Sequence, residues 1–249
     1  MIFLIIFLFG LASGSFLNVV ILRLGTKKSF LGGRSHCPNC KKIISWYDNI
    51  PVLSFLILKA RCRQCDKKIS WQYLVIEIAT ALIFVLLYFN FGLSFKFFSY
   101  VVFVSFLIII FVYDLKHYLI LDKVSLPAMV VAFVANLILG LSLFNLIIGA
   151  LIGGGFFAAQ YFISKGKWVG GGDIRLGILM GLILGWQLLL VALFLAYLIG
   201  AIFGLSLIAL NKKKMSSQVP FGPFLTVATL VSLIYGQVIL NWYLRLLYV

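Results

Sequence analysis

Repeated apolar runs of membrane-spanning length are the feature that most constrains this chain. The hydrocarbon core of a bilayer is about 30 Å thick and needs about 20 apolar residues per helical span. Runs of this kind occur at Met1–Leu22, Tyr73–Phe89, Phe97–Tyr113, Val124–Gly140, Phe144–Ile163, Ile174–Leu210 and Val219–Leu244. Because 63% of the residues are hydrophobic and only 11% are charged, a soluble globular fold is excluded. The sequence predicts an all-α polytopic membrane protein.

The run Ile174–Leu210 decides how many spans we expect. It is too long for one helix, and Gly185-Trp186-Gln187 supplies a break with an interfacial aromatic side chain. Eleven Lys and Arg residues lie between Arg23 and Trp71, which predicts a cytoplasmic location for that loop. Lys212-Lys213-Lys214 falls on the same side only if Ile174–Leu210 forms two helices. We therefore expect about eight transmembrane helices, with both termini outside.

The formal net charge of +15 raises the question of a nucleic-acid partner. The basic residues lack an accompanying platform of aromatic side chains on which bases could stack. Their distribution is the one that sets the orientation of a membrane protein, and an anionic inner leaflet attracts basic residues next to the membrane. We expect membrane lipid as a partner and no nucleic acid.

The polar loop contains all four cysteines in two similar segments, "CPNCKKIISW" and "CRQCDKKISW". Two Cys-x2-Cys knuckles can together provide four thiolates to one tetrahedral zinc ion. Such a site has no open coordination position, so the ion is expected to be structural. The ligands would be Cys37, Cys40, Cys62 and Cys65. Two disulfides or free thiols are the alternatives, although a reducing cytoplasm disfavours disulfides, and His36 is an alternative ligand.

All six acids lie at or near the expected cytoplasmic ends of the spans, and three of them flank membrane helices. An ionisable residue at the edge of a helical bundle is a functional candidate because its desolvation is unfavourable. Asp122 and Asp173 precede helices, where an aspartate can serve as a cap. Asp114 ends a span, where the helix dipole disfavours an anion, so its position requires another explanation.

Glycines surround Asp173. Gly170-Gly171-Gly172 removes side chains where the backbone can approach another helix or a substrate. Asp173, Gly177, Gly181 and Gly185 then recur every fourth residue on one helix face, which favours close packing against another span. The span that ends at Asp114 is a candidate neighbour. Two aspartates at one depth can form an acid–base pair for peptide hydrolysis; capping and packing alone are the alternative.

Several segments together resemble a known family. The motifs "YDLKHYLILD" and "GGGDIRLG" resemble the two aspartate motifs of the type IV prepilin leader peptidases, membrane aspartyl proteases of the GxGD type. "GSFLNVVILRL", "NIPVLSFLILKARCRQC" and "PFGPFL" resemble the bacterial branch that has two activities. The resemblance implies that Asp114 and Asp173 are catalytic and that the four cysteines bind zinc. Leu121 and Gly25 stand where the family commonly has prolines, which concerns loop geometry and neither catalytic position.

The resemblance also implies an activity and a location. The enzyme would lie in the bacterial cell membrane with its active site facing the cytoplasm. It would remove the leader of prepilins or competence pseudopilins and then N-methylate the new N-terminus with S-adenosylmethionine. Glu77 is the acid that we consider for the methyl-donor site; the alternative is that it pairs with a basic loop residue. Gly10-x3-Gly14 is interpreted as a helix-packing motif rather than a nucleotide-binding one.

The expected organisation has three parts: residues 1–22 form the first transmembrane helix, residues 23–72 the cytoplasmic zinc loop, and residues 73–249 a seven-helix membrane domain. Two alternative functions remain at this point. One is a leader peptidase without methyl transfer, and the other is a proton-coupled carrier that uses the aspartate pair as a relay. The position of all acids near one face argues against the carrier.

Overall fold

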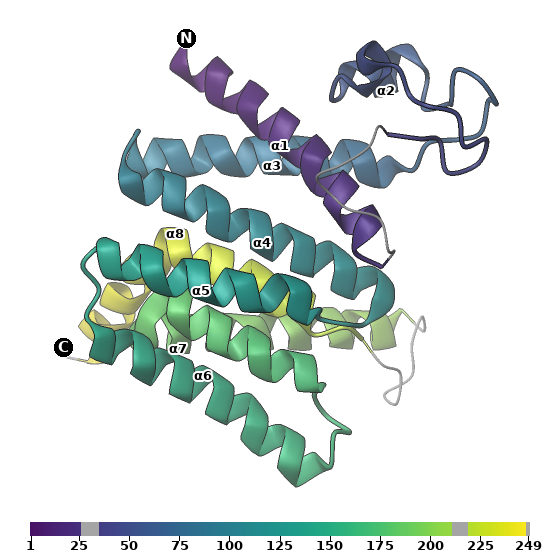
Figure 1. The fold of residues 1–249 in the computed structure, drawn as a ribbon. Coiled ribbons are helices and arrows are strands. Elements are labelled where there is room, and N and C mark those ends of the chain that lie inside the picture. Colours follow the sequence, from purple (N-terminus) through teal and green to yellow (C-terminus); the bar gives the residue numbers. More distant parts are fainter. Residues whose placement is uncertain (26–34, 211–218, 248–249) are drawn as a thin grey trace. The chain divides into compact units, whose positions relative to one another are not determined.

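The computed structural model describes residues 1–25, 35–210 and 219–247, and this part of the chain is nearly all helical (Figure 1). The long helices are α1 (Ile2–Leu24), α3 (Trp71–Phe91), α4 (Phe95–His117), α5 (Asp122–Ile138), α6 (Leu143–Ser164), α7 (Gly171–Ala209) and α8 (Gly222–Leu247). A short helix α2 (Leu53–Ile57) and a 3-10 turn η1 (Trp46–Asn49) lie in the polar loop. The described residues form no strand beyond two isolated bridges, so the all-α prediction is confirmed.

Six of these helices are long and apolar enough to cross a membrane: α1, α3, α4, α6, α7 and α8. The chain is therefore a multi-pass membrane protein. Helix α5 has 17 residues and is shorter than the other six. The expected total of eight spans stays a prediction, and the Lys212-Lys213-Lys214 signal that supported it lies outside the described residues.

The chain forms two compact units, residues 1–97 and 98–249. In the first unit α1 packs directly on α3 through two glycines. A Cβ atom on Gly10 would lie 2.5 Å from the Cα atom of Ala81, and one on Gly14 would lie 2.7 Å from the Cα atom of Glu77. Because any side chain would hold the two backbones apart, the interpretation of Gly10-x3-Gly14 as a packing motif is confirmed.

In the second unit the glycine face of α7 packs on α6. A Cβ atom on Gly153 would collide with the carbonyl oxygen of Gly177, and one on Gly149 would lie 2.7 Å from the carbonyl oxygen of Gly181. Close packing of the stripe is thus confirmed. Its partner is α6, however, and not the span that ends at Asp114. The reason is that α6 carries its own glycines at matching positions, whereas α4 offers large side chains.

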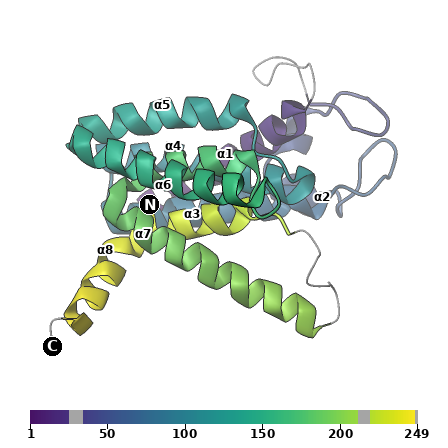
Figure 2. The same cartoon turned by 90° about the horizontal axis from the view of Figure 1, so that it is seen from below.

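Helix α7 folds back on itself at Gly185, whose φ of 72° and ψ of 172° are not helical. The first arm, residues 171–184, runs along α6 toward Asn145, whose Oδ1 atom accepts a hydrogen bond from the N–H of Trp186 at 2.9 Å. The second arm, residues 186–209, returns in the opposite direction, because the hydroxyl of Tyr197 reaches Gln160 near the other end of α6. It is the lime ribbon that leads toward residue 210 in Figure 2. The expected break at Gly185-Trp186-Gln187 is confirmed.

Two asparagines satisfy backbone groups that the break leaves without helical partners. The Nδ2 atom of Asn136 in α5 donates to the carbonyl oxygens of Leu182 at 2.6 Å and Ile183 at 3.0 Å. Asn145 in α6 accepts from the first N–H of the second arm, as described above. Unpaired backbone groups are strongly unfavourable in an apolar environment, so these side chains stabilise the fold-back.

The contact between α6 and α7 predicts that alanine substitutions at two glycines of α6 have different effects on the stability of the protein. Gly153→Ala forces the two backbones apart and should destabilise the protein by about 1–3 kcal/mol, as overpacked cores do. Gly155→Ala is the matched control, because a Cβ atom there meets nothing within 4 Å. Thermal unfolding of both variants in nanodiscs measures the difference. Equal stabilities would contradict the close contact.

Candidate active site and metal centre

Asp114 lies in the last turn of α4, and its carboxylate is bound by the start of α8. The side chain is buried, and the backbone N–H of Gly222 donates to its Oδ2 atom at 3.0 Å. A Cβ atom on Gly222 would lie 2.6 Å from the same oxygen, so only glycine allows this approach. The N-terminus of α8 carries the positive end of a helix dipole, which compensates for the unfavourable dipole of α4.

Asp173 lies in the first turn of α7 and is also buried. Its Oδ2 atom accepts a hydrogen bond from the backbone N–H of Gly170 at 2.8 Å. The alternative that Asp173 caps its own helix is therefore correct in part, because it satisfies an N–H at the helix start from the third helical position. This hydrogen bond engages one carboxylate oxygen, and a capping role does not exclude chemistry at the other.

The second unit brings Asp114 and Asp173 to the same end of the bundle. Their charges lie within electrostatic reach of each other. The segment that follows α4 also packs on the start of α7, since a Cβ atom on Gly172 would lie 2.9 Å from the Cβ atom of Ile120. The candidate pair is thus close in space, although the two residues lie on helices that are far apart in sequence.

The three glycines before Asp173 have different surroundings. Gly170 provides the N–H that binds Asp173, and Gly172 provides the space for Ile120. A Cβ atom on Gly171 would meet nothing within 4 Å, so this position is open. The neighbour at Gly172 is a side chain in the segment between α4 and α5. The expected approach of another helix or a substrate to these glycines stays a prediction.

Tyr197 and Phe221 are further neighbours of the pair that the sequence analysis did not identify. Their ring centroids lie 5.0 Å apart, and Phe221 directly precedes the glycine that binds Asp114. Tyr197 lies within electrostatic reach of Asp173, and its hydroxyl donates to the Oε1 atom of Gln160 at 2.9 Å. Gly222 was likewise missed as a site residue. The only sequence signal for Gly222 was the resemblance of the "PFGPFL" segment to the family, and the segment itself did not indicate that its backbone binds an aspartate.

Asp122 has a different environment from Asp114 and Asp173. It forms an ion pair with Arg175, and both side chains are about half exposed (49% and 44%). An exposed pair of this kind contributes little to stability, typically about 0–1 kcal/mol. Asp122 therefore provides a natural comparison for the two buried aspartates.

Glu77 lies in the first unit, where it binds the polar loop. The side chain is buried, and its Oε2 atom accepts a hydrogen bond from the backbone N–H of Val52 at 2.8 Å. In the described part of the chain its partners are thus the backbone N–H of Val52 and the side chain of Ser15, and the alternative of pairing with a basic loop residue is not observed. Asn18 and Gln72 form a nearby polar contact between α1 and α3, with 3.3 Å between the Gln72 Nε2 and Asn18 Oδ1 atoms.

The four cysteines converge as predicted. Their Sγ atoms all lie within 4.8 Å of one another, and those of Cys37 and Cys65 are 3.8 Å apart. Zinc–sulfur bonds of about 2.3 Å in a tetrahedron require sulfur separations of about 3.8 Å, so the donor set fits a zinc ion. All four thiols are free, which rules out the disulfide alternative in this structure. His36 is exposed and lies outside the cluster.

Backbone N–H groups near the thiols lower the pKa values of two of them, which favours the thiolate form that binds a cation. The N–H of Lys67 lowers the pKa of the Cys65 thiol to about 6, and the N–H of Cys40 lowers the pKa of Cys37. At Cys40 the N–H of Lys42 also lowers the pKa, but desolvation and hydrogen bonds with Cys37 and Cys65 outweigh it and raise the pKa to about 11. Thiols that share one site resist joint ionisation unless a cation balances their charge.

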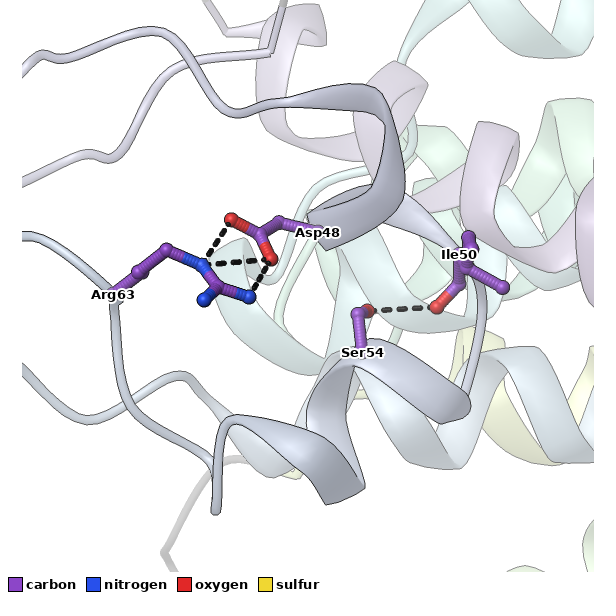
Figure 3. A network of polar contacts seen from close by, with 4 residues as sticks. All are labelled: Asp48, Ile50, Ser54 and Arg63. Atoms are coloured by element: carbon purple, nitrogen blue, oxygen red, sulfur yellow. Dashed lines mark hydrogen bonds and ion pairs between the residues drawn. The ribbon is translucent and has the colours of Figure 1, made fainter.

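The two knuckles have the same backbone geometry, and an ion pair joins the second knuckle to the turn after the first. The N–H of Cys37 donates to the carbonyl oxygen of Lys42 at 3.0 Å, and that of Cys62 donates to Lys67 at 2.9 Å. Arg63 of the second knuckle binds both carboxylate oxygens of Asp48 in η1 (Figure 3). The sequence similarity of the two segments thus corresponds to a structural repeat.

Comparison with known proteins assigns the chain to a family. Residues 8–91 match the bacterial peptidase A24 N-terminal domain, and residues 101–205 match the type IV leader peptidase family. A prepilin leader peptidase/N-methyltransferase of Bacillus subtilis (strain 168) is 34% identical, with 97% of this chain and 98% of the relative covered. The chain belongs to the type IV leader peptidase family.

Other members of this family are similarly close. Proteins of the same name from Aeromonas salmonicida (strain A449) and Legionella pneumophila are 34% and 30% identical, with 97% of this chain and 94% of each relative covered. No solved structure matches the chain significantly. The first matched region contains Glu77 and the four cysteines, and the second contains both buried aspartates.

The four-cysteine cluster gives a direct prediction. Purified protein should contain one zinc ion per chain by elemental analysis, and Cys37→Ser should lose the metal, because three thiolates bind zinc more weakly than four. His36→Gln is the control and should retain it. Retention of a full zinc ion with unchanged affinity in Cys37→Ser, or its loss in His36→Gln, would contradict the four-thiolate site.

Proposed function

We propose that this protein is a membrane aspartyl endopeptidase that removes the leader of type IV prepilins or competence pseudopilins. Asp114 and Asp173 are the catalytic residues. The observation that carries the proposal is that two buried carboxylates from separate helices lie within electrostatic reach of each other, in the region matched by the type IV leader peptidase family. Neither carboxylate takes part in an ion pair with the residues that the structure describes. Buried acids of this kind are typical of acid–base catalysis.

Hydrolysis needs one member of the pair ionised and the other protonated. The ionised carboxylate removes a proton from a water molecule, which attacks the scissile carbonyl carbon. The protonated carboxyl donates its proton to the carbonyl oxygen, which gives a tetrahedral diol. The carboxyl that took the proton from water then passes it to the nitrogen as the C–N bond breaks, and a diol hydroxyl returns its proton to the other carboxylate. The N–H groups of Gly222 and Gly170 hold one oxygen of each carboxylate, which orients the other toward the water and the substrate.

We place the pair at the cytoplasmic face. The basic content of the polar loop supports this orientation, because Lys and Arg accumulate on the cytoplasmic side of membrane proteins. In that position the enzyme cuts a precursor just outside the apolar segment of the substrate, which stays in the bilayer. Soluble substrates that lack such a segment are not expected to be cleaved.

We also propose that the protein N-methylates the new N-terminus with S-adenosylmethionine. The names of the relatives from three bacteria support this second activity. When bound, the cofactor supplies an electrophilic methyl group. The polar cluster of Glu77, Asn18 and Gln72 offers hydrogen-bonding groups for such a ligand, and Glu77 is the residue that we propose for it.

The zinc ion is structural because four thiolates leave no open position.

Two assays distinguish the proposal from its alternatives. Incubation of the purified enzyme with a pilin precursor and a labelled methyl donor should yield a shortened and labelled product. A shortened but unlabelled product would support the alternative of a leader peptidase without methyl transfer. Proton transport into vesicles without precursor cleavage would favour the carrier.

Removal of either buried carboxylate should abolish cleavage. General acid and base contributions are typically about 10²–10⁴-fold each, so Asp114→Asn and Asp173→Asn should each lower the rate at least about 100-fold. Asp122→Asn is the matched control, since Asp122 is half exposed and paired with Arg175. The mobility shift of a pilin precursor on a gel measures the rate. Normal processing by either of the first two variants would refute the pair.

Gly222→Ala tests how Asp114 is held. The added methyl group lies 2.6 Å from the Asp114 Oδ2 atom, so it must displace the carboxylate from the backbone N–H. We expect cleavage to fall at least about 10-fold, as it does when a positioned donor is lost, while the helical content is retained. Gly236→Ala in the same helix is the control, because its nearest neighbour is the flexible end of Leu188 at 3.2 Å. Equal activity of both variants would exclude this role for Gly222.

A further inference from the structure

The short helix α2 is attached to the side of α3 and not to its end. Val52, directly before α2, binds Glu77 at 2.8 Å, and the ring of Phe55 lies 5.2 Å from that of Trp71. Trp71 is the first residue of α3, and Glu77 lies six residues further along. Since a helix rises about 1.5 Å per residue, Glu77 is about 9 Å below the start of α3. Helix α2 therefore lies beside the first turns of a membrane-spanning helix.

The turn that leads into α2 fixes its direction. Val52 has a φ of 61°, which is unfavourable for a β-branched residue. The N–H of Leu53 donates to the carbonyl oxygen of Pro51 at 2.6 Å, which closes a γ-turn around Val52. Glu77 binds the N–H of the same residue and holds the turn in place. A strained turn that a buried carboxylate secures indicates that the position of α2 is a selected feature.

The outer face of α2 is apolar, and no other described residues bury it. Leu53, Leu56 and Ile57 are 56%, 60% and 72% exposed, whereas Phe55 faces inward and is 7% exposed. Residues at i, i+3 and i+4 share one side of a helix, so the three exposed side chains form a continuous apolar face. In a loop surrounded by water this arrangement would be unfavourable.

Basic side chains adjoin this face. Lys59, Arg61 and Lys68 line a pocket of about 590 Å³ together with Ser70 and Trp71. All three basic side chains are exposed, and Trp71 is 67% exposed at the point where α3 begins. Tryptophan is enriched at the level of lipid headgroups, so its position at the start of a membrane-spanning helix favours a location of the pocket near the phosphates.

We propose that α2 is an interfacial helix that inserts its apolar face into the bilayer, with the headgroup of an anionic phospholipid in the adjoining basic pocket. Lipid is the occupant that the position favours, because the first turns of a membrane-spanning helix are flanked by headgroups and upper acyl chains. The charge of the pocket complements an anionic phosphate. Through the Asp48–Arg63 ion pair this contact also fixes the four-cysteine module at the membrane surface.

Site-specific photocrosslinking of the full-length protein in nanodiscs tests the proposal. p-Benzoyl-phenylalanine replaces Ile57 in one variant and Leu56 in a second, which guards against a local effect of either substitution. Gln64, which is exposed between Cys62 and Cys65, is the control position. We expect phospholipid adducts by mass spectrometry at residues 56 and 57, at least about five times more abundant than at residue 64. Adducts to protein, from this chain or from a second copy, or equal labelling at the three positions, would overturn the interfacial placement.

The composition of the nanodisc tests the headgroup pocket. In mixtures of phosphatidylglycerol and phosphatidylcholine, the adduct at residue 57 should contain phosphatidylglycerol in excess of its mole fraction. The triple change Lys59→Gln, Arg61→Gln and Lys68→Gln should remove this excess and leave the total lipid adduct unchanged. An excess that survives the triple change would refute the basic pocket. Neither outcome depends on peptidase activity, so failure here is distinguishable from failure of the proposed function.

Discussion

The direct backbone contact between α6 and α7 is the constraint on which the second unit depends. Lipid tails are as apolar as the side chains of the helices, so apolar burial does not drive helices together within a bilayer. Close approach does, through dispersion forces between backbones. Gly149 and Gly153 face Gly181 and Gly177 so closely that no Cβ atom fits between them. This seam, together with the fold-back at Gly185, fixes where α7 begins and therefore where Asp173 lies.

The candidate active site uses helix ends for a physical reason. The interior of a membrane helix offers no free N–H groups, because each is paired within the helix. The first turns of α7 and α8 do offer them, and one binds each buried carboxylate. Helix ends thus provide polar groups at the membrane boundary without additional polar side chains. The same principle applies in the first unit, where the backbone of the polar loop binds Glu77.

Local patterns predicted much of this structure, and non-local contacts account for what was missed. The spacing of the cysteines predicted that the four thiols converge, because the ligands of one tetrahedral site must lie close together. The glycine stripe predicted close packing of α7 but not its partner, since a small-residue face fits any helix with a similar face. Gly222 was missed because it binds an aspartate 108 residues earlier in the chain, and nothing near Asp114 indicates that contact. The fold-back was predicted, but the asparagines that stabilise it lie on other helices.

The central claim is that Asp114 and Asp173 act on one water molecule. An experimental structure of the enzyme with a precursor peptide, in which a hydroxyl-bearing carbon replaces the scissile carbonyl, tests it most directly. We expect the hydroxyl oxygen to lie about 2.6–3.2 Å from an oxygen of each carboxylate. Carboxylates that stay too far apart to share that oxygen, with the peptide bound elsewhere, would contradict the claim.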